Sequence, residues 1–184
     1  MGVSDTKSGY GWISIALHWI TAVTVVAMLT IGVMSQGAAI DVHARLVRLH
    51  TSIGLAMYAL LWGRIAWRFV VGHPGPLPRQ GRFFFTIGKY FHFTLLAAIA
   101  VMLVSGPLMA WSAGDSIGLF GLTLPSPILR MPQAHDLLRR VHGLTASFIL
   151  AGLILHVLAV FKHTVINRDG TFDKIMIADR GRRP

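Results

Sequence analysis

Four long apolar stretches, separated by polar segments, dominate the pattern of the chain. They cover about residues 12–34, 46–71, 84–111 and 137–161. A helix needs roughly 20 apolar residues to cross a hydrocarbon core about 30 Å thick, and each stretch reaches that length. The pattern therefore predicts an all-α fold, a transmembrane four-helix bundle that forms a single integral membrane domain over residues 1–184.

The segments between the stretches are expected to be irregular. Residues 1–11 are short and polar, and we expect them to lie loosely on one side of the membrane. Residues 73–79 contain three prolines and cannot continue a helix. The loop 112–133 includes the apolar residues 117–124, which are too few to span and should lie at the interface or cap the bundle. A polar, basic tail follows from residue 162.

Composition restricts both the partners and the cofactors. The formal charge of +10 arises from 17 Lys and Arg against 7 acidic residues, but long apolar stretches separate the basic residues, so nucleic acid is not an expected partner. The chain contains no cysteine, which excludes disulfides, iron–sulfur clusters and thiolate ligands. Any metal cofactor must therefore be held by histidine or by oxygen.

The Lys and Arg residues also predict an orientation, because cytoplasmic loops carry an excess of them. Four spans put both termini and the second loop on one side, which carries twelve: Lys7, Arg64, Arg68, Arg79, Arg82, Lys89, Lys162, Arg168, Lys174, Arg180, Arg182 and Arg183. The other side carries five: Arg45, Arg48, Arg130, Arg139 and Arg140. We expect a lipid-embedded protein of the bacterial inner membrane with both termini cytoplasmic.

Histidines within the spans are the candidate chemistry, since such residues are costly in a membrane. His142 and His156 lie fourteen residues apart in the fourth stretch. In a helix this places them roughly 40° apart on one face and about 21 Å apart along the axis. The predicted topology puts His18 and His156 near the cytoplasmic edge, and His50 and His142 near the opposite edge.

Two histidine pairs at two depths can each clamp one haem iron through neutral imidazoles. The pattern thus predicts two haems. An interhelical hydrogen bond is the alternative for any one of these histidines. His92 enters at the depth of His18 and could replace it as the partner of His156; the spacing leaves both open. His163 is expected to be interfacial or a quinone contact, and His92 is a second candidate for a quinone contact. Three further histidines are expected to be solvated: His43, His73 and His135.

Arginines precede both histidines of the second pair. They could lie at the membrane edge with their charged ends in water, or neutralise haem carboxylates, or attract an anionic reductant. These candidate anion-steering residues are Arg45, Arg48, Arg139 and Arg140.

The motifs resemble those of the prokaryotic cytochrome b561 family, which is similar to the haem b subunits of formate dehydrogenases and nickel-iron hydrogenases. The resemblance covers about residues 10–165 and rests on Ile15-Ala-Leu-His18-Trp19, His50-Thr-Ser-Ile-Gly54, Arg64-Ile-Ala-Trp-Arg68, and His142 with His156. It implies two b-type haems, one held by His18 and His156 and the other by His50 and His142. The resemblance therefore favours His18 over His92.

The loop Phe120-Gly-Leu-Thr-Leu-Pro125 resembles that of stand-alone cytochromes b561 that oxidise superoxide and reduce ubiquinone. This implies an oxidoreductase of the superoxide:quinone type, in which outer-sphere electron transfer requires no further catalytic residue. The alternative is a haem b membrane anchor that passes electrons between a partner dehydrogenase or hydrogenase and the quinone pool. A histidine-bearing transporter or scaffold without haem is a third hypothesis, and it predicts a colourless protein.

Overall fold

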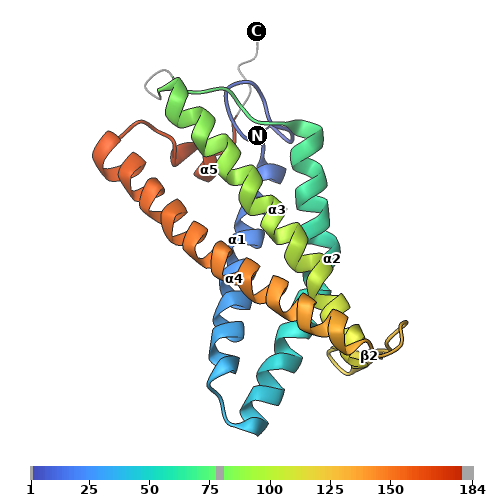
Figure 1. Ribbon diagram of the computed structural model, residues 1–184. Coiled ribbons are helices and arrows are strands. Elements are labelled where there is room, and N and C mark those ends of the chain that lie inside the picture. The colour runs from blue at the N-terminus through green and yellow to red at the C-terminus, as the bar shows by residue number, and fades with distance from the viewer. Residues whose placement is uncertain (1, 78–80, 180–184) are drawn as a thin grey trace. The chain divides into compact units, whose positions relative to one another are not determined.

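Four long helices form most of the protein (Figure 1). The computed structural model describes residues 2–77 and 81–179. The long helices are α1 (Trp12–Gln36), α2 (Ile40–Val71), α3 (Arg82–Ala113) and α4 (Pro132–Phe161), which continues as a π-helical turn, η1 (Lys162–Asn167). A short α5 (Asp173–Met176) lies near the C-terminus. All four long helices are apolar and long enough to cross a membrane, which confirms the predicted fold class.

Two helices begin earlier than the apolar pattern predicted. Helix α2 starts at Ile40 and α4 at Pro132, because a helix can continue beyond its apolar stretch. Asp41 in the first turn of α2 suits the positive end of the helix dipole, and Pro132 suits a first helical position. Four residues in the orientation count, Arg79, Arg180, Arg182 and Arg183, lie outside the described residues.

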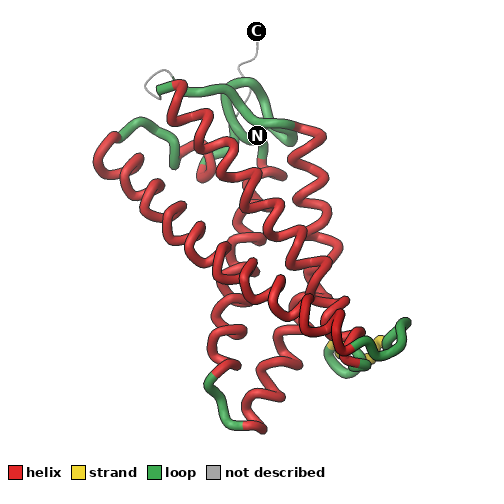
Figure 2. The backbone as a smooth tube through the Cα atoms, viewed as in Figure 1, coloured by secondary structure: helices red, strands yellow, loops and turns green. Residues whose placement is uncertain are grey.

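The loop between α3 and α4 contains a β-hairpin that the sequence pattern did not predict (Figure 2). Strands β1 (Ile117–Leu119) and β2 (Leu122–Leu124) pair antiparallel, with Leu119 opposite Leu122. Phe120 and Gly121 connect them with positive φ angles of 44° and 100°, as a tight two-residue hairpin requires. Strands of three residues are too short to show a clear alternation. Ser52 on α2 binds the hairpin through the Gly118 carbonyl at 3.0 Å.

The chain divides into two compact units, and each long helix contributes a segment to both. The first unit comprises the described residues of 2–21, 63–97 and 151–179, and the second comprises 22–62 and 98–150. The single membrane domain that the sequence predicts over residues 1–184 therefore stays a prediction. Each of the two expected histidine pairs falls within one unit.

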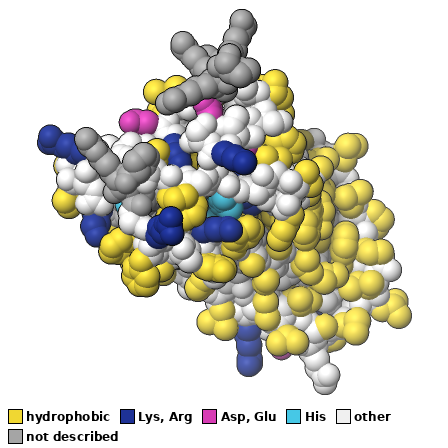
Figure 3. Space-filling model, turned by 90° about the horizontal axis from the view of Figure 1, so that it is seen from above, with side chains coloured by type: hydrophobic (Ala, Val, Ile, Leu, Met, Phe, Trp, Pro, Cys, Tyr) yellow, Lys and Arg dark blue, Asp and Glu magenta, His cyan; other side chains and the backbone are white. Residues whose placement is uncertain are grey.

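Both units expose many large apolar side chains and bury several polar ones, unlike a typical water-soluble protein. Apolar side chains such as Val23 and Leu155 are exposed, and apolar atoms cover much of the surface seen in Figure 3. Buried positions instead include Ser14, Arg68 and Ser105. Lipid is as apolar as leucine, so exposed aliphatic side chains cost nothing there, whereas polar groups must find partners inside.

The N-terminal segment is held in place, contrary to the expectation that it lies loosely. The Lys7 carbonyl accepts a hydrogen bond of 2.9 Å from the Gly75 backbone N–H in the proline-rich segment. The Tyr10 carbonyl accepts one of the same length from Asp179. Three segments far apart in the sequence thus bond to one another within the first unit. Their polar composition gave no indication of this, because the pairing is made by backbone groups.

Candidate cofactor sites

Three histidines from three helices lie together in the first unit. They are His18 on α1, His92 on α3 and His156 on α4. The ring centres of His18 and His156 are 6.3 Å apart, with an interplanar angle of 59°. The ring centres of His92 and His156 are 5.0 Å apart and the rings are nearly perpendicular, at 87°.

A separate pair lies in the second unit. His50 on α2 and His142 on α4 have ring centres 6.4 Å apart and an interplanar angle of 71°. Both expected histidine pairs are therefore brought together, each within its own unit.

The separations can be compared with those of imidazoles that share a metal ion. A metal–imidazole bond is about 2 Å long and the nitrogen lies roughly 1 Å from the ring centre, so two rings on opposite sides of one ion have centres about 6 Å apart. The His18–His156 and His50–His142 separations match this value. The His92–His156 separation is shorter. Among the described residues, no three His, Asp or Glu side chains are grouped so that they could hold a metal ion directly.

The Nδ1 atoms of two of these histidines have hydrogen-bond partners, and a third Nδ1 is buried without one. His142 Nδ1 lies 3.0 Å from Ser105 Oγ, and His92 Nδ1 donates to the Gly88 carbonyl at 2.6 Å. His50 Nδ1 is buried without a hydrogen-bond partner. A bond at Nδ1 leaves Nε2 for a metal ion, the usual division of roles for a ligating histidine.

Two glycines lie against the histidines of the second unit. A Cβ at Gly32 on α1 would lie 3.8 Å from His50 Cε1, and one at Gly106 on α3 would lie 3.4 Å from His142 Cε1. These positions and Ser105 were missed in the sequence. A signal for the glycines exists, because Gly32 follows His18 by fourteen residues and Gly106 follows His92 by fourteen.

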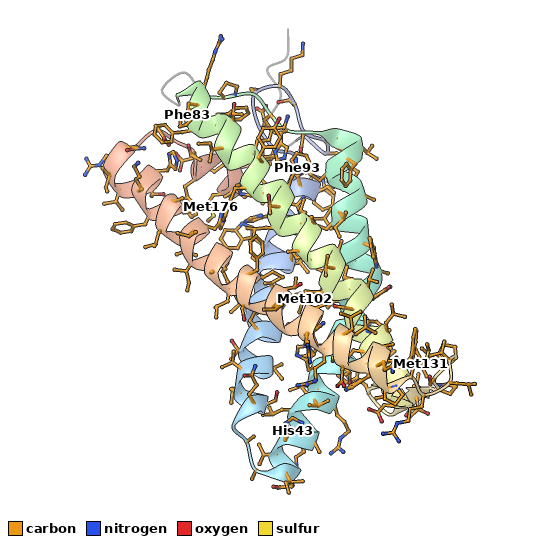
Figure 4. All side chains as sticks on the ribbon, in the orientation of Figure 1. His43, Phe83, Phe93, Met102, Met131 and Met176 are labelled. Atoms are coloured by element: carbon orange, nitrogen blue, oxygen red, sulfur yellow. The ribbon has the colours of Figure 1, made fainter. Side chains whose placement is uncertain are left out.

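Two of the remaining histidines have defined partners in the second unit. His43, exposed on α2 near the turn from α1 (Figure 4), has its Nδ1 2.7 Å from the Ser35 carbonyl. His135 is half-buried, with Nδ1 3.0 Å from the Met109 carbonyl. The expectation of a solvated side chain is wrong for His135, because the tertiary fold supplies an acceptor.

His73 is also half-buried, contrary to the same expectation. Its Nδ1 lies 3.4 Å from the Tyr10 hydroxyl, and its ring meets the edge of Phe93 with centres 5.2 Å apart. Burial, assisted by the charge of Arg68, lowers the pKa of His73 to about 4. His73 is therefore neutral at physiological pH.

His163 in η1 pairs with the C-terminal segment. Its Nδ1 lies 2.5 Å from Asp169 Oδ2. Burial opposes ionisation of that carboxyl, but hydrogen bonds from Thr171 and His163 outweigh this effect and lower the pKa of Asp169. A quinone contact at His163 stays a prediction, as does one at His92.

The four candidate anion-steering arginines lie in the second unit, on exposed parts of α2 and α4. Arg45 pairs with Asp41 at 3.7 Å, and Arg139 with Asp136 at 4.0 Å, both on the surface. Such pairs are weak and leave the guanidinium groups accessible. Arg48 lines an open depression of about 390 Å³ together with Ser52 and the hairpin.

Membrane-length helices that carry two facing imidazole pairs are features of a b-type membrane cytochrome. Comparison with known proteins agrees with this class. The profile of the family described as prokaryotic cytochrome b561 matches residues 9–177. The chain therefore belongs to the prokaryotic cytochrome b561 family, whose members bind haem b and transfer electrons in membranes.

Two relatives match along almost their whole length. Cytochrome b561 homolog 2 of Escherichia coli (strain K12) is 26% identical over 179 residues, which cover 96% of this chain and 95% of the relative. The probable superoxide oxidase CybB of Yersinia pestis is 22% identical over 172 residues, covering 94% and 98% respectively.

Proposed function

We propose that this protein holds two haems b, one between His18 and His156 and the other between His50 and His142. The observation that carries the proposal is the separation of 6.3 Å and 6.4 Å between the ring centres of the two pairs. It is the spacing expected for imidazoles on opposite sides of one iron.

The histidine pairs would hold each haem through two imidazoles, and this ligation would determine what the site can do. When bound, haem supplies one-electron oxidation and reduction. Two imidazoles held on one iron would leave no position open for dioxygen or another small ligand. Ser105, a hydrogen-bond partner of His142 Nδ1, orients the His142 ring. The chain's own residues thus favour electron transfer over oxygen binding.

We further propose that the electron donor is superoxide and the acceptor is a membrane quinone, with ubiquinone as the expected type. Two superoxide ions would each lose one electron to become dioxygen, and one quinone would take up the two electrons and two protons to become quinol. The hairpin loop sequence and the name of the Yersinia relative support this substrate. Arg45, Arg48, Arg139 and Arg140 would raise the local concentration of the anion on the periplasmic side.

Steering by arginine can be tested with the purified protein. The double variant Arg48→Gln, Arg139→Gln is expected to reduce quinone with superoxide several-fold more slowly than wild type at low salt. The difference should shrink as salt is added, because salt screens the attraction. Arg82→Gln, an exposed charge in the first unit, is the matched control. Equal rates and equal salt dependence in all three proteins would contradict the steering role.

The excess of Lys and Arg supports a location in the bacterial inner membrane with both termini cytoplasmic. A reporter fused to the C-terminus that is active only in the cytoplasm tests this orientation directly. Activity of a reporter that requires the periplasm, at the same position, would contradict it.

The hairpin region offers a specific reason to consider a partner subunit. Phe120 and Leu122 are each 70% exposed and Leu129 is 87% exposed. Apolar side chains of this kind could contact lipid or a dehydrogenase, for which this chain would be the membrane anchor. Purified protein that turns over superoxide and quinone without any copurifying chain would exclude a required partner.

A further inference from the structure

Arg64 on α2 is a buried cation whose hydrogen bonds are incomplete. The residue is 8% exposed, and its Nη1 atom is buried without a hydrogen-bond partner. Six buried side-chain N or O atoms within the described ranges lack a partner, and this is the only one that belongs to a permanently charged group. A buried charge without an acceptor is strongly unfavourable, so a missing partner is implied.

The neighbouring carboxylate does not supply that partner. Asp5 lies near Arg64, but its Oδ2 pairs with Arg68 Nη1 at 3.3 Å, with both side chains at most 3% exposed. The other oxygen, Oδ1, accepts a bond of 2.9 Å from the Gly11 backbone N–H. Asp5 therefore compensates Arg68, and the first unit retains one buried positive charge at Arg64.

Arg64 belongs to the unit that contains the first histidine cluster. It follows His50 by fourteen residues, the spacing that separates His142 from His156, so it shares a helix face with His50. Its charge acts on both His18 and His92 within the first unit. The guanidinium group is therefore within electrostatic range of two histidines, in the unit proposed to hold the first haem.

We propose that Arg64 binds a carboxylate side chain of the haem held by His18 and His156. The inference rests on the proposed function, because it requires a haem at that pair. A permanent buried cation needs a permanent anion, and guanidinium and carboxylate match in charge and geometry. A quinone fits less well, since it is uncharged when oxidised and leaves the site when exchanged.

Redox titration of the purified holoprotein tests the proposal. A nearby cation disfavours the more positive, oxidised haem, so Arg64→Gln should lower the midpoint potential of one haem and leave the other unchanged. Arg64→Lys keeps the charge without the bidentate geometry, and we expect a smaller shift in the same direction. It also serves as the test if Arg64→Gln does not fold. Arg82→Gln, which removes an exposed charge from the same unit, should change neither potential.

A second readout follows the carboxylate itself. Reduced-minus-oxidised infrared spectra should show a carboxylate band that shifts in both Arg64 variants and not in Arg82→Gln. Unchanged potentials and bands, in a protein whose wild type carries two haems, would overturn this inference alone. Weaker quinone binding with unchanged potentials would assign Arg64 to the quinone and also overturn it. A wild type without haem would instead overturn the proposed function on which the inference rests.

Discussion

Three chemically identical imidazoles meet in the first unit, and only their geometry distinguishes their roles. The ring centres of His18 and His156 have the separation expected for two imidazoles that share one iron, whereas the ring centre of His92 lies only 5.0 Å from that of His156. His92 is therefore better placed to pack against a ligand than to be one.

This distinction predicts different losses of haem in two variants. His18→Ala should reduce the haem content from two per chain to one, because the iron loses an axial ligand. His92→Ala should retain two. Pyridine haemochrome spectra of the purified proteins measure this directly, and a loss confined to His92→Ala would reverse the assignment.

Ser105 should tune the second site through His142. Its Oγ is the hydrogen-bond partner of His142 Nδ1 at 3.0 Å, and the residue is only 2% exposed. Removing such an outer partner typically weakens metal binding about 10–100-fold, so Ser105→Ala should retain haem more poorly. Ser112→Ala is the control, since the hydroxyl of this equally buried serine on α3 donates to the Met109 carbonyl. Equal haem retention in both variants would contradict the role of Ser105.

Single residues were predictable from sequence where a polar group interrupts an apolar stretch. His18, His50, His142 and His156 stand out in this way, and the structure brings each predicted pair together. The hydrogen-bond partners of these histidines could not be predicted from the sequence. Ser105 is a common residue in a membrane helix, and its contact with His142 depends on the rotation of α3 against α4.

At the scale of elements, one spacing recurs in all four helices. Fourteen residues separate His18 from Gly32, His50 from Arg64, His92 from Gly106, and His142 from His156. Each helix thus contributes one position to each unit on nearly the same face. In the second unit, the glycines leave room for the imidazoles of the other two helices.

A large side chain at Gly106 should therefore displace His142. Gly106→Leu is expected to lose the second-unit haem and to retain the other, because a Cβ there already lies 3.4 Å from the ring. Gly63→Leu is a matched control, since nothing lies within 4 Å of its added Cβ. Haem content and the visible spectrum measure the result. Two haems with wild-type spectra in Gly106→Leu would show that the ring does not need this space.

The four long helices were predictable because each apolar stretch is long enough and hydrophobic enough to cross a membrane as a helix. The ends of α2 and α4 were not, since the apolar pattern marks the membrane rather than the helix. The hairpin β1–β2 was missed because strands of three residues are too short to show the alternation of apolar and polar residues that marks a strand. Its attachment through Ser52 is a tertiary contact that no local signal reveals.

At the scale of the molecule, the polar segments of the first unit are joined to one another by hydrogen bonds. Residues from the N-terminal, proline-rich and C-terminal segments bond to one another, and the Lys174 Nζ atom donates to the Gly75 carbonyl at 2.7 Å. The buried Asp5–Arg68 pair joins the N-terminal segment to α2. The sequence shows the charges of this pair but not that they meet.

Breaking that pair should destabilise the protein markedly. Asp5→Asn leaves Arg68 charged and buried, and removal of one partner of a buried pair typically costs about 3–5 kcal/mol. Asp41→Asn breaks the exposed pair with Arg45 and should cost less than about 1 kcal/mol. Thermal unfolding in a mild detergent compares the two. Similar midpoints for Asp5→Asn and wild type would contradict the structural importance of the pair.

The central claim is that two histidine pairs each hold one haem b, and the most direct test is the haem-to-protein ratio combined with electron paramagnetic resonance of the oxidised protein. We predict two haems per chain, both low-spin with two imidazole ligands. A ratio of one or zero, or a high-spin haem with an open axial position, would contradict the assignment of His18, His50, His142 and His156.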